Sequence, residues 1–228
     1  MTKVETFLVG QGFGSKFFYR LIRGLIILLS VIYFRVRVFG KENVPKTGAF
    51  ILAPIHRSNI DTPLAAYVSS RRLRFMGKDS IWKFAPIGWV LSALGAFPVT
   101  RGSADREALK RCIAVLEAGE PLVLFPEGTR QSGPIVQPLF DGAAYVAVKA
   151  GVPIIPVGIG GSERVMPKGS KMIYPRKCVL VVGEPIIAAM DETGRVPRSA
   201  VKDVTSRLYE DLQRLFDEAQ RLAGTPNG

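Results

Sequence analysis

Short apolar runs alternate with amphipathic segments along most of the chain after Gly40. The runs are rich in β-branched residues and only a few residues long, which predicts buried strands. We expect these strands at 49–54, 73–76, 96–99, 121–125, 154–159 and 178–182. Alternation of strands with helices is typical of an α/β fold, so we predict a mixed, largely parallel sheet covered by helices.

Three amphipathic segments are predicted to form helices. The first has Ser103 as its N-cap and repeats apolar side chains at helical spacing through Leu116. The second, 142–149, is rich in small residues, which favours close packing on the sheet. The third carries an apolar stripe from Val201 to Ala219, which indicates a long helix packed on the core.

The N-terminal apolar segment has a different character. Its uninterrupted apolar stretch, 24–34, has arginines close by on both sides, and its eleven residues would extend only ~16 Å as a helix. A bilayer core of ~30 Å takes about 20 residues to cross. Aromatic and cationic side chains prefer the headgroup boundary, so we expect residues 1–38 to form a membrane-interfacial helical segment. A buried core helix is the alternative, and a full span by residues 15–38 stays open.

Composition adds a strong positive charge to this picture. Lysine and arginine number 31 against 19 acidic residues, which gives a formal charge of +12. Such a balance favours anionic partners, namely phosphorylated metabolites, an acidic membrane surface or nucleic acid. Because no nucleic-acid-binding module is recognisable, we expect no nucleic acid partner. The two cysteines, Cys112 and Cys178, are isolated, so we expect neither a metal site nor a disulfide.

The single histidine of the chain lies directly after the first predicted strand. His56 is followed five residues later by Asp61, and Pro63 favours a helix that begins near Asp61. His56 would then lie in the turn before the helix, where its ring can fold back onto the carboxylate. An aspartate that accepts from one ring nitrogen leaves the other free to act as a general base. Alternatively, Asp61 only caps the helix and His56 only fills the turn.

Two further polar clusters follow predicted strands. Arg101 comes after strand 96–99, just before a helix N-terminus, where a guanidinium and free backbone N–H groups suit a phosphate. Residues 127–130, Glu-Gly-Thr-Arg, come after strand 121–125. Active residues of such folds collect at the carboxyl ends of strands, so we expect the clusters to converge. A surface arginine without a ligand and a plain turn are the alternatives.

Together these clusters resemble the motifs of the glycerolipid acyltransferase family, whose best-known activity is 1-acylglycerol-3-phosphate acyltransferase. Residues 56–61, 97–101, 125–130 and 152–157 are similar to its four motifs in order, and the resemblance covers roughly 40–185. It implies an acyltransferase domain at 39–228 that moves a fatty acyl group from an acyl thioester to the free hydroxyl of 1-acylglycerol 3-phosphate, giving phosphatidic acid for phospholipid synthesis. Glycerol 3-phosphate, another lysophospholipid or a glycolipid are alternative acceptors, and a non-catalytic basic membrane adaptor is a remote alternative.

The resemblance also implies roles for individual residues. His56 would take the proton of the acceptor hydroxyl and Asp61 would orient its ring. The acceptor phosphate would be held by Lys78, Arg101 and Arg130, while Glu127, Gly128 and Thr129 would contact the acceptor or brace the turn. The chain departs from the family pattern at Gln131, where serine is common, and near Asp141, where a lysine is common. No metal or cofactor is implied, since acyl-CoA or acyl-carrier protein is a co-substrate.

The two tryptophans lie in an apolar stretch just before the second motif. We predict that Trp82 and Trp89 line the acyl route or touch the membrane, with a buried core segment as the alternative. The expected partners are therefore a lysophospholipid acceptor, an acyl thioester donor and an anionic membrane surface. The expected location is the cytoplasmic face of the cell membrane, as a peripheral or monotopic protein.

Overall fold

The strands form one mixed, largely parallel sheet, as the alternation of patterns predicts. The computed structural model describes residues 12–99, 106–170, 172–187 and 194–226, except the side chains of Ser15 and Lys78. Within this part, seven strands pair in the order β1-β7-β6-β2-β5-β3-β4. They are β1 (Arg37–Phe39), β2 (Ile51–Pro54), β3 (Arg74–Lys78), β4 (Ala96–Val99), β5 (Leu122–Val123), β6 (Ile154–Gly160) and β7 (Val179–Val182). Only the β6–β7 pair is antiparallel.

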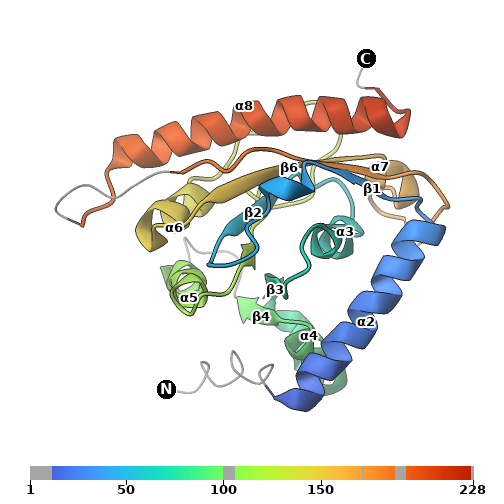
Figure 1. The fold of residues 1–228 in the computed structure, drawn as a ribbon, viewed down its shortest axis with the longest axis horizontal. Coiled ribbons are helices and arrows are strands. Elements are labelled where there is room, and N and C mark those ends of the chain that lie inside the picture. The colour runs from blue at the N-terminus through green and yellow to red at the C-terminus, as the bar shows by residue number, and fades with distance from the viewer. Residues whose placement is uncertain (1–11, 100–105, 171, 188–193, 227–228) are drawn as a thin grey trace.

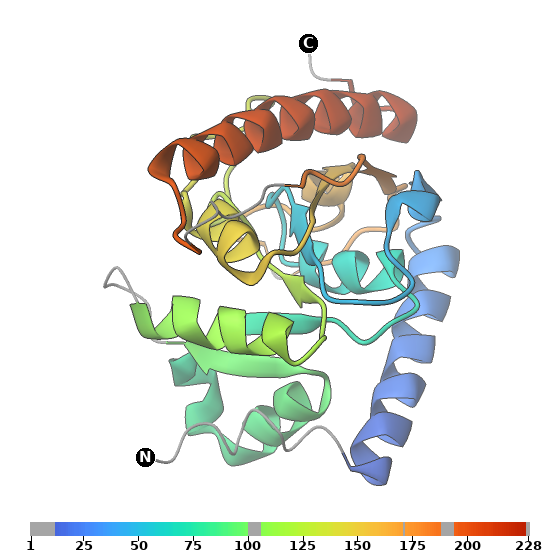
Figure 2. The same cartoon turned by 60° about the vertical axis from the view of Figure 1, so that its left-hand side comes forward.

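Helices cover both faces of the sheet. The α-helices are α2 (Phe13–Ile32), α3 (Asp61–Val68), α4 (Ala85–Ala93), α5 (Arg106–Glu117), α6 (Gly142–Ala150), α7 (Ser162–Val165) and α8 (Arg198–Ala223), joined by the 3-10 turns η2 (Lys41–Asn43) and η3 (Asp79–Lys83). Helix α8 runs across one face and α3 packs on the other (Figure 1). Helix α2 lies along the side of the molecule, with α4 near its N-terminal end (Figure 2).

Helix α8 rests directly on β6 because that strand contains glycine where the two backbones meet. A Cβ atom at Gly158 would lie 2.2 Å from the Leu215 carbonyl oxygen, and one at Gly160 would lie 2.2 Å from that of Ala219. The absent side chains thus allow a backbone-to-backbone approach. Strand β6 is buried at every residue, as expected for a central strand covered on both faces.

The predicted strands and helices recur with shifted ends. The helix predicted near Asp61 begins at that residue, and the predicted stripe on α8 is buried from Val201 to Ala219. Strand β1 was not predicted, because its residues were assigned to the interfacial segment. It forms the sheet edge by pairing in parallel with β7, through register pairs such as Arg37 with Val179. The predicted N-cap Ser103 lies outside the described residues.

Helix α2 exposes most of its apolar side chains. Phe13 is 88% exposed and Ile32 is 68% exposed, and the remaining large exposed residues on α2 are Phe17, Leu21, Leu25, Leu28, Leu29 and Val31. Among the side chains described in α2, only Tyr19 and Ser30 are buried. The exposure of α2 therefore contradicts the alternative that this segment is a buried core helix. Of the helices in the described part, none has the length and apolarity needed to cross a bilayer.

Candidate active site

The site lies at the carboxyl ends of two adjacent parallel strands. Strand β2 ends at Pro54, two residues before His56, and β5 ends at Val123, shortly before Glu127. The strands pair directly, with Ile51 opposite Leu122, so the two segments leave the same edge of the sheet. The predicted convergence of these two clusters is observed. The second cluster cannot be placed, because Arg101 lies outside the described residues.

The imidazole of His56 folds back onto the Asp61 carboxylate. The Nδ1–Oδ2 distance is 3.1 Å, and Asp61 is fully buried at the start of α3. The same Oδ2 atom accepts hydrogen bonds of 2.6 Å from the backbone N–H groups of Arg57 and Ser58. Because the carboxylate oxygen is an acceptor, Nδ1 carries the ring proton and Nε2 keeps its lone pair. Asp61 thus orients the ring and also binds the turn that carries it.

Phe125 supports the ring from the side. Its ring centroid lies 4.1 Å from that of His56, with the planes 28° apart. With one face of the imidazole stacked and Nδ1 bonded, the His56 side chain is only 16% exposed. Its free edge, which carries Nε2, is the part that a substrate in the adjoining cavity can reach. This arrangement suits a fixed general base.

A buried ion pair joins the first and third clusters. Arg57 is 1% exposed, and its Nη1 atom donates to both carboxylate oxygens of Glu127, at 2.8 and 2.9 Å. Glu127 also accepts from the backbone N–H groups of His56, at 3.0 Å, and of Gln137, at 3.1 Å. Arg57 further donates to the Ile135 carbonyl oxygen, at 3.0 Å. Glu127 therefore braces the site and does not line its cavity.

Sequence reasoning missed Arg57. The residue adjoins His56, but the spacing between His56 and Asp61 by itself assigns no role to the residues between them. A second signal was present, because Glu127 follows a buried strand and a buried carboxylate needs a cation. Matching these two residues requires knowing that β2 and β5 are neighbours, which the sequence alone does not say.

A cavity of about 420 Å³ has His56 in its wall. It brings Arg130, Thr129 and Trp82 together with the histidine, and its other lining residues are Asn59, Thr62, Phe75, Met76, Gly77, Ile81, Leu91 and Ala96. The wall therefore combines an imidazole and a guanidinium with a few neutral polar side chains and with aromatic and aliphatic ones. Trp82 is fixed there by a hydrogen bond of 3.0 Å from its Nε1 to Ser92 Oγ.

A second, almost wholly apolar cavity of about 190 Å³ adjoins the first. The two share Thr62, Phe75, Leu91 and Ala96 in their walls, and the second extends between α2, α3 and α4 to Ile26, Pro63 and Leu94. A hydrocarbon chain is the kind of group that such walls bind best. Nothing in the sequence pattern indicated this cavity, because its walls come from five separate elements.

The remaining predicted residues lie in different places. Lys78 ends β3, and its side chain is outside the described part. Gly128 has φ of 69°, and a Cβ there would lie 2.8 Å from the Phe140 ring, so the turn requires glycine. Trp89 is 56% exposed, packs against Phe18 with ring centroids 5.4 Å apart, and does not line the histidine cavity.

The two cysteines are buried and free. Burial raises the pKa of each thiol to about 12, so both stay protonated near neutral pH and are poor nucleophiles. Within the described residues, no group of three or more His, Cys, Asp or Glu side chains is arranged to hold a metal ion.

Comparisons with known proteins agree with this geometry. Residues 35–160 match the model of the Acyltransferase family. The chain is 31% identical over 188 residues to the 1-acyl-sn-glycerol-3-phosphate acyltransferase of Bacillus subtilis, covering 82% of this chain and 91% of that protein. It is 29% identical over 153 residues to the chloroplastic 1-acyl-sn-glycerol-3-phosphate acyltransferase BAT2 of Brassica napus. That match covers 66% of this chain but only 44% of the plant protein.

A solved structure has the same fold. The crystal structure of the 1-acyl-sn-glycerophosphate (LPA) acyltransferase PlsC from Thermotoga maritima superposes with a TM-score of 0.72. The two sequences are 27% identical, and the superposition covers 88% of this chain and 80% of that one. The sheet and the helices that position His56 therefore belong to an architecture already known in lipid acyl transfer.

Proposed function

The chain belongs to the Acyltransferase family, and from this premise we propose that it transfers a fatty acyl group to the free hydroxyl of 1-acylglycerol 3-phosphate. The product is phosphatidic acid, a precursor of phospholipids. The observation that carries the proposal is that His56, with Nδ1 bonded to Asp61, lines one cavity together with Arg130, and that an apolar cavity adjoins it. A phosphate, a hydroxyl and a fatty chain each have a matching surface there.

The reaction follows from the orientation of the imidazole. Nε2 of His56 takes the proton of the acceptor hydroxyl as its oxygen attacks the thioester carbonyl carbon. Asp61 stabilises the resulting imidazolium through Nδ1. The tetrahedral intermediate then expels the thiolate, the carbon–sulfur bond breaks, and the imidazolium returns its proton to the sulfur. The donor is acyl-CoA or acyl-carrier protein, no acyl-enzyme forms, and no metal or bound cofactor takes part.

The decisive experiment offers the purified chain a panel of acceptors with an acyl thioester. Free thiol and lipid product are followed together for 1-acylglycerol 3-phosphate, glycerol 3-phosphate, another lysophospholipid and a glycolipid. We expect the highest kcat/KM with 1-acylglycerol 3-phosphate and no effect of a metal chelator. A preference for another acceptor would replace the proposed substrate but keep the chemistry. Vesicle binding without any thiol release would favour a non-catalytic membrane adaptor.

Arg130 is proposed to hold the acceptor phosphate, together with Lys78 and Arg101. Changing Arg130 to lysine keeps the charge but removes the two-pronged donor geometry that suits a phosphate. We expect the KM for the acceptor to rise about tenfold, the equivalent of one good charge-assisted contact, with kcat nearly unchanged. Initial rates measured against each substrate in turn provide the check. An increase confined to the KM of the acyl donor would contradict the assignment.

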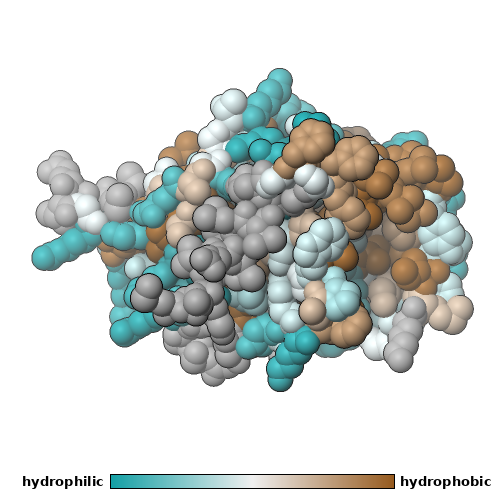
Figure 3. All heavy atoms as spheres, turned by 90° about the horizontal axis from the view of Figure 1, so that it is seen from below, coloured by the Kyte–Doolittle hydropathy of each residue, from teal (hydrophilic) through white to brown (hydrophobic). Residues whose placement is uncertain are grey.

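We further propose that the chain sits on the cytoplasmic face of the cell membrane as a peripheral or monotopic protein. The support is an apolar surface made by the exposed residues of α2 together with Phe84, Ile87 and Trp89 of the η3–α4 region. Apolar side chains gather on the face and side of the molecule where α2 and α4 lie (Figure 3). The net charge of +12 adds attraction to anionic lipid.

The two tryptophans allow this surface to be tested separately from the cavity. Trp89→Ser removes an exposed ring from the apolar surface, and Trp82→Ser removes one from the histidine cavity. We expect Trp89→Ser to weaken vesicle binding about tenfold, since an interfacial indole contributes on the order of 1–2 kcal/mol. Trp82→Ser is expected to leave vesicle binding unchanged and to alter acyl-chain preference. Vesicle sedimentation and assays with donors of graded chain length provide the measurements. Equal effects of both variants in both assays would show that the segment acts only as core.

A further inference from the structure

A basic cavity lies on the opposite edge of the sheet from His56. Its volume is about 560 Å³, and it lies between α2 and the segments that lead into β3 and β5. Because β2, β5 and β3 are parallel neighbours, these segments enter at the amino edge, whereas His56 leaves from the carboxyl edge. None of the residues that line it also lines the histidine cavity. It is therefore a separate site.

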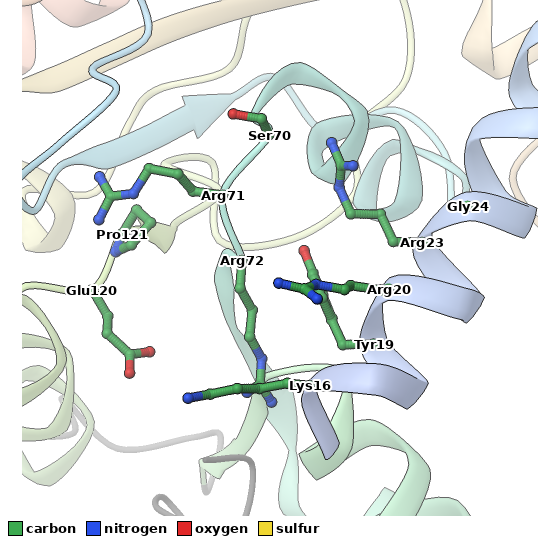
Figure 4. A pocket seen from close by; sticks show the side chains of 10 residues that line it. All are labelled: Lys16, Tyr19, Arg20, Arg23, Gly24, Ser70, Arg71, Arg72, Glu120 and Pro121. Atoms are coloured by element: carbon green, nitrogen blue, oxygen red, sulfur yellow. The ribbon is translucent and has the colours of Figure 1, made fainter. Parts of the chain in front are cut away.

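The walls of the basic cavity concentrate positive charge. Lys16, Arg20 and Arg23 extend from α2, and Arg71 and Arg72 come from the facing segment (Figure 4). The single carboxylate in the walls, Glu120, forms an ion pair with Arg74, which is not itself a wall residue. Five cations of the wall thus face one carboxylate, which is shared with Arg74 and also acts on Arg72. Such a concave cluster attracts anions.

The guanidinium groups are held by neutral acceptors, which leave their charge in place. Arg71 donates to the carbonyl oxygen of Gly119 at 3.1 Å, and Arg72 donates to that of Ala93 at 2.7 Å. Arg72 also lies over the Tyr19 ring, 5.4 Å from its centroid. Burial, and then the neighbouring Arg74, lower the pKa of Arg72, while the Glu120 carboxylate raises it.

The α2 wall supplies three cations, of which two are not engaged elsewhere among the described residues. Lys16, Arg20 and Arg23 recur at helical spacing on one face of α2. Arg23 is fixed by a hydrogen bond of 2.5 Å to the Ser69 carbonyl oxygen. The side chains of Lys16 and Arg20 make no hydrogen bond or ion pair with any described residue. They can turn toward a ligand without breaking an existing contact.

Apolar surfaces adjoin this charge on two sides. The exposed apolar face of α2 lies beside the three cations on the same helix, and the apolar cavity of about 190 Å³ shares Tyr19 and Arg23 with the basic cavity. A ligand that fits must therefore combine an anionic group with a hydrocarbon part. Free phosphate or a nucleotide would use the cations and leave the apolar surfaces without a partner.

We propose that the basic cavity binds the phosphate monoester headgroup of a membrane glycerolipid, at a second site distinct from the catalytic one. A monoester carries more charge and more free oxygens than the phosphodiester of other anionic lipids, which suits five cations. If the proposed function holds, the substrate and the product both carry this headgroup, and the cavity retains the enzyme where they are abundant. Binding itself does not depend on catalysis.

The test compares vesicles that differ in headgroup but not in surface charge. The full chain is sedimented with phosphatidylcholine vesicles that contain either phosphatidate or phosphatidylglycerol, with the amounts adjusted to equal zeta potential. We expect about tenfold tighter binding to the phosphatidate vesicles, the worth of one strong charge-assisted contact. In the double variant Lys16→Gln/Arg20→Gln the ratio of the two affinities is expected to fall to about one. Lys202→Gln/Arg207→Gln on α8, which also loses two exposed cations, should keep the ratio.

The ratio separates a headgroup site from general attraction to negative membranes. A wild-type ratio of one, or a pocket variant that loses affinity for both vesicles equally, would overturn the proposal. Equally tight binding of inorganic phosphate without vesicles would assign the cavity to a soluble anion and overturn the lipid assignment. His56→Ala should keep the wild-type ratio. Failure of the acyl-transfer assay alone would therefore count against the proposed function and leave this site intact.

Discussion

Replacing His56 by alanine is expected to lower kcat by about 10²- to 10⁴-fold, the usual contribution of a general base. The proton of the acceptor hydroxyl would then have to pass to water, since no other residue described in the wall of the histidine cavity carries an imidazole, a carboxylate or an amine. Steady-state rates with 1-acylglycerol 3-phosphate and an acyl thioester give the measurement. Full activity of the variant would exclude the mechanism.

The control for this variant is a measurement of whether it still folds. His56 lies at the cavity wall and its side chain is partly exposed, so its removal should cost little stability. We expect the alanine variant to keep the melting temperature within a few degrees and to bind vesicles as the wild type does. Asp61→Asn is expected to lose activity as well, because an amide can present N–H to Nδ1 and favour the wrong tautomer. A loss of activity accompanied by unfolding would be a structural effect and not a catalytic one.

Changing Arg57 to methionine is expected to destabilise the protein by about 3–5 kcal/mol, the usual cost of breaking a buried ion pair. The substitution leaves the Glu127 carboxylate buried without its cation. For a chain of this size, that loss corresponds to a fall in Tm of roughly 10 °C or more. Thermal and urea unfolding give the measurement. Activity should fall too, because Glu127 holds the backbone of His56.

Two variants isolate the cause of this loss. Arg57→Met/Glu127→Gln removes both charges, and we expect it to recover a large part of the stability, because no uncompensated carboxylate remains. Arg214→Met breaks a partly exposed ion pair with Asp211 on α8 and should cost below about 1 kcal/mol. If Arg57→Met and Arg214→Met lost the same stability, the buried pair would not be the brace described above.

The strands and the histidine–aspartate pair were predictable because their signals are local. A β-branched apolar run specifies a buried strand such as β6, and Pro63 just after Asp61 specifies where α3 begins. Strand β1 carried no such signal. Its residues, Arg37 to Phe39, are mostly exposed, and they become a strand through pairing with β7, which lies far along the chain. Edge strands of this kind are set by tertiary context more than by their own pattern.

The parts of the site that escaped prediction depend on contacts between distant segments. Glu127 was left between two roles, contact with the acceptor and bracing, and only the burial of Arg57 beside it favours bracing. Trp82 and Trp89 were grouped because they are close in sequence. The start of α4 between them turns one toward the histidine cavity and leaves the other on the surface beside Phe18. Spacing along a chain cannot separate neighbours in this way.

The attachment of α2 to the body of the protein has a consequence for the choice of lipid. The helix is held near its N-terminal end by the Phe18–Trp89 contact, in its middle by Arg23, and after its end by the hydrogen bond of 3.1 Å from Val36 N to Ser30 O, next to β1. If α2 rests in the membrane interface, as proposed above, the height of His56 above the hydrocarbon is set by the protein. An acceptor must then present its hydroxyl at that height. The protein would select lipids by the depth of the reactive group as well as by its charge.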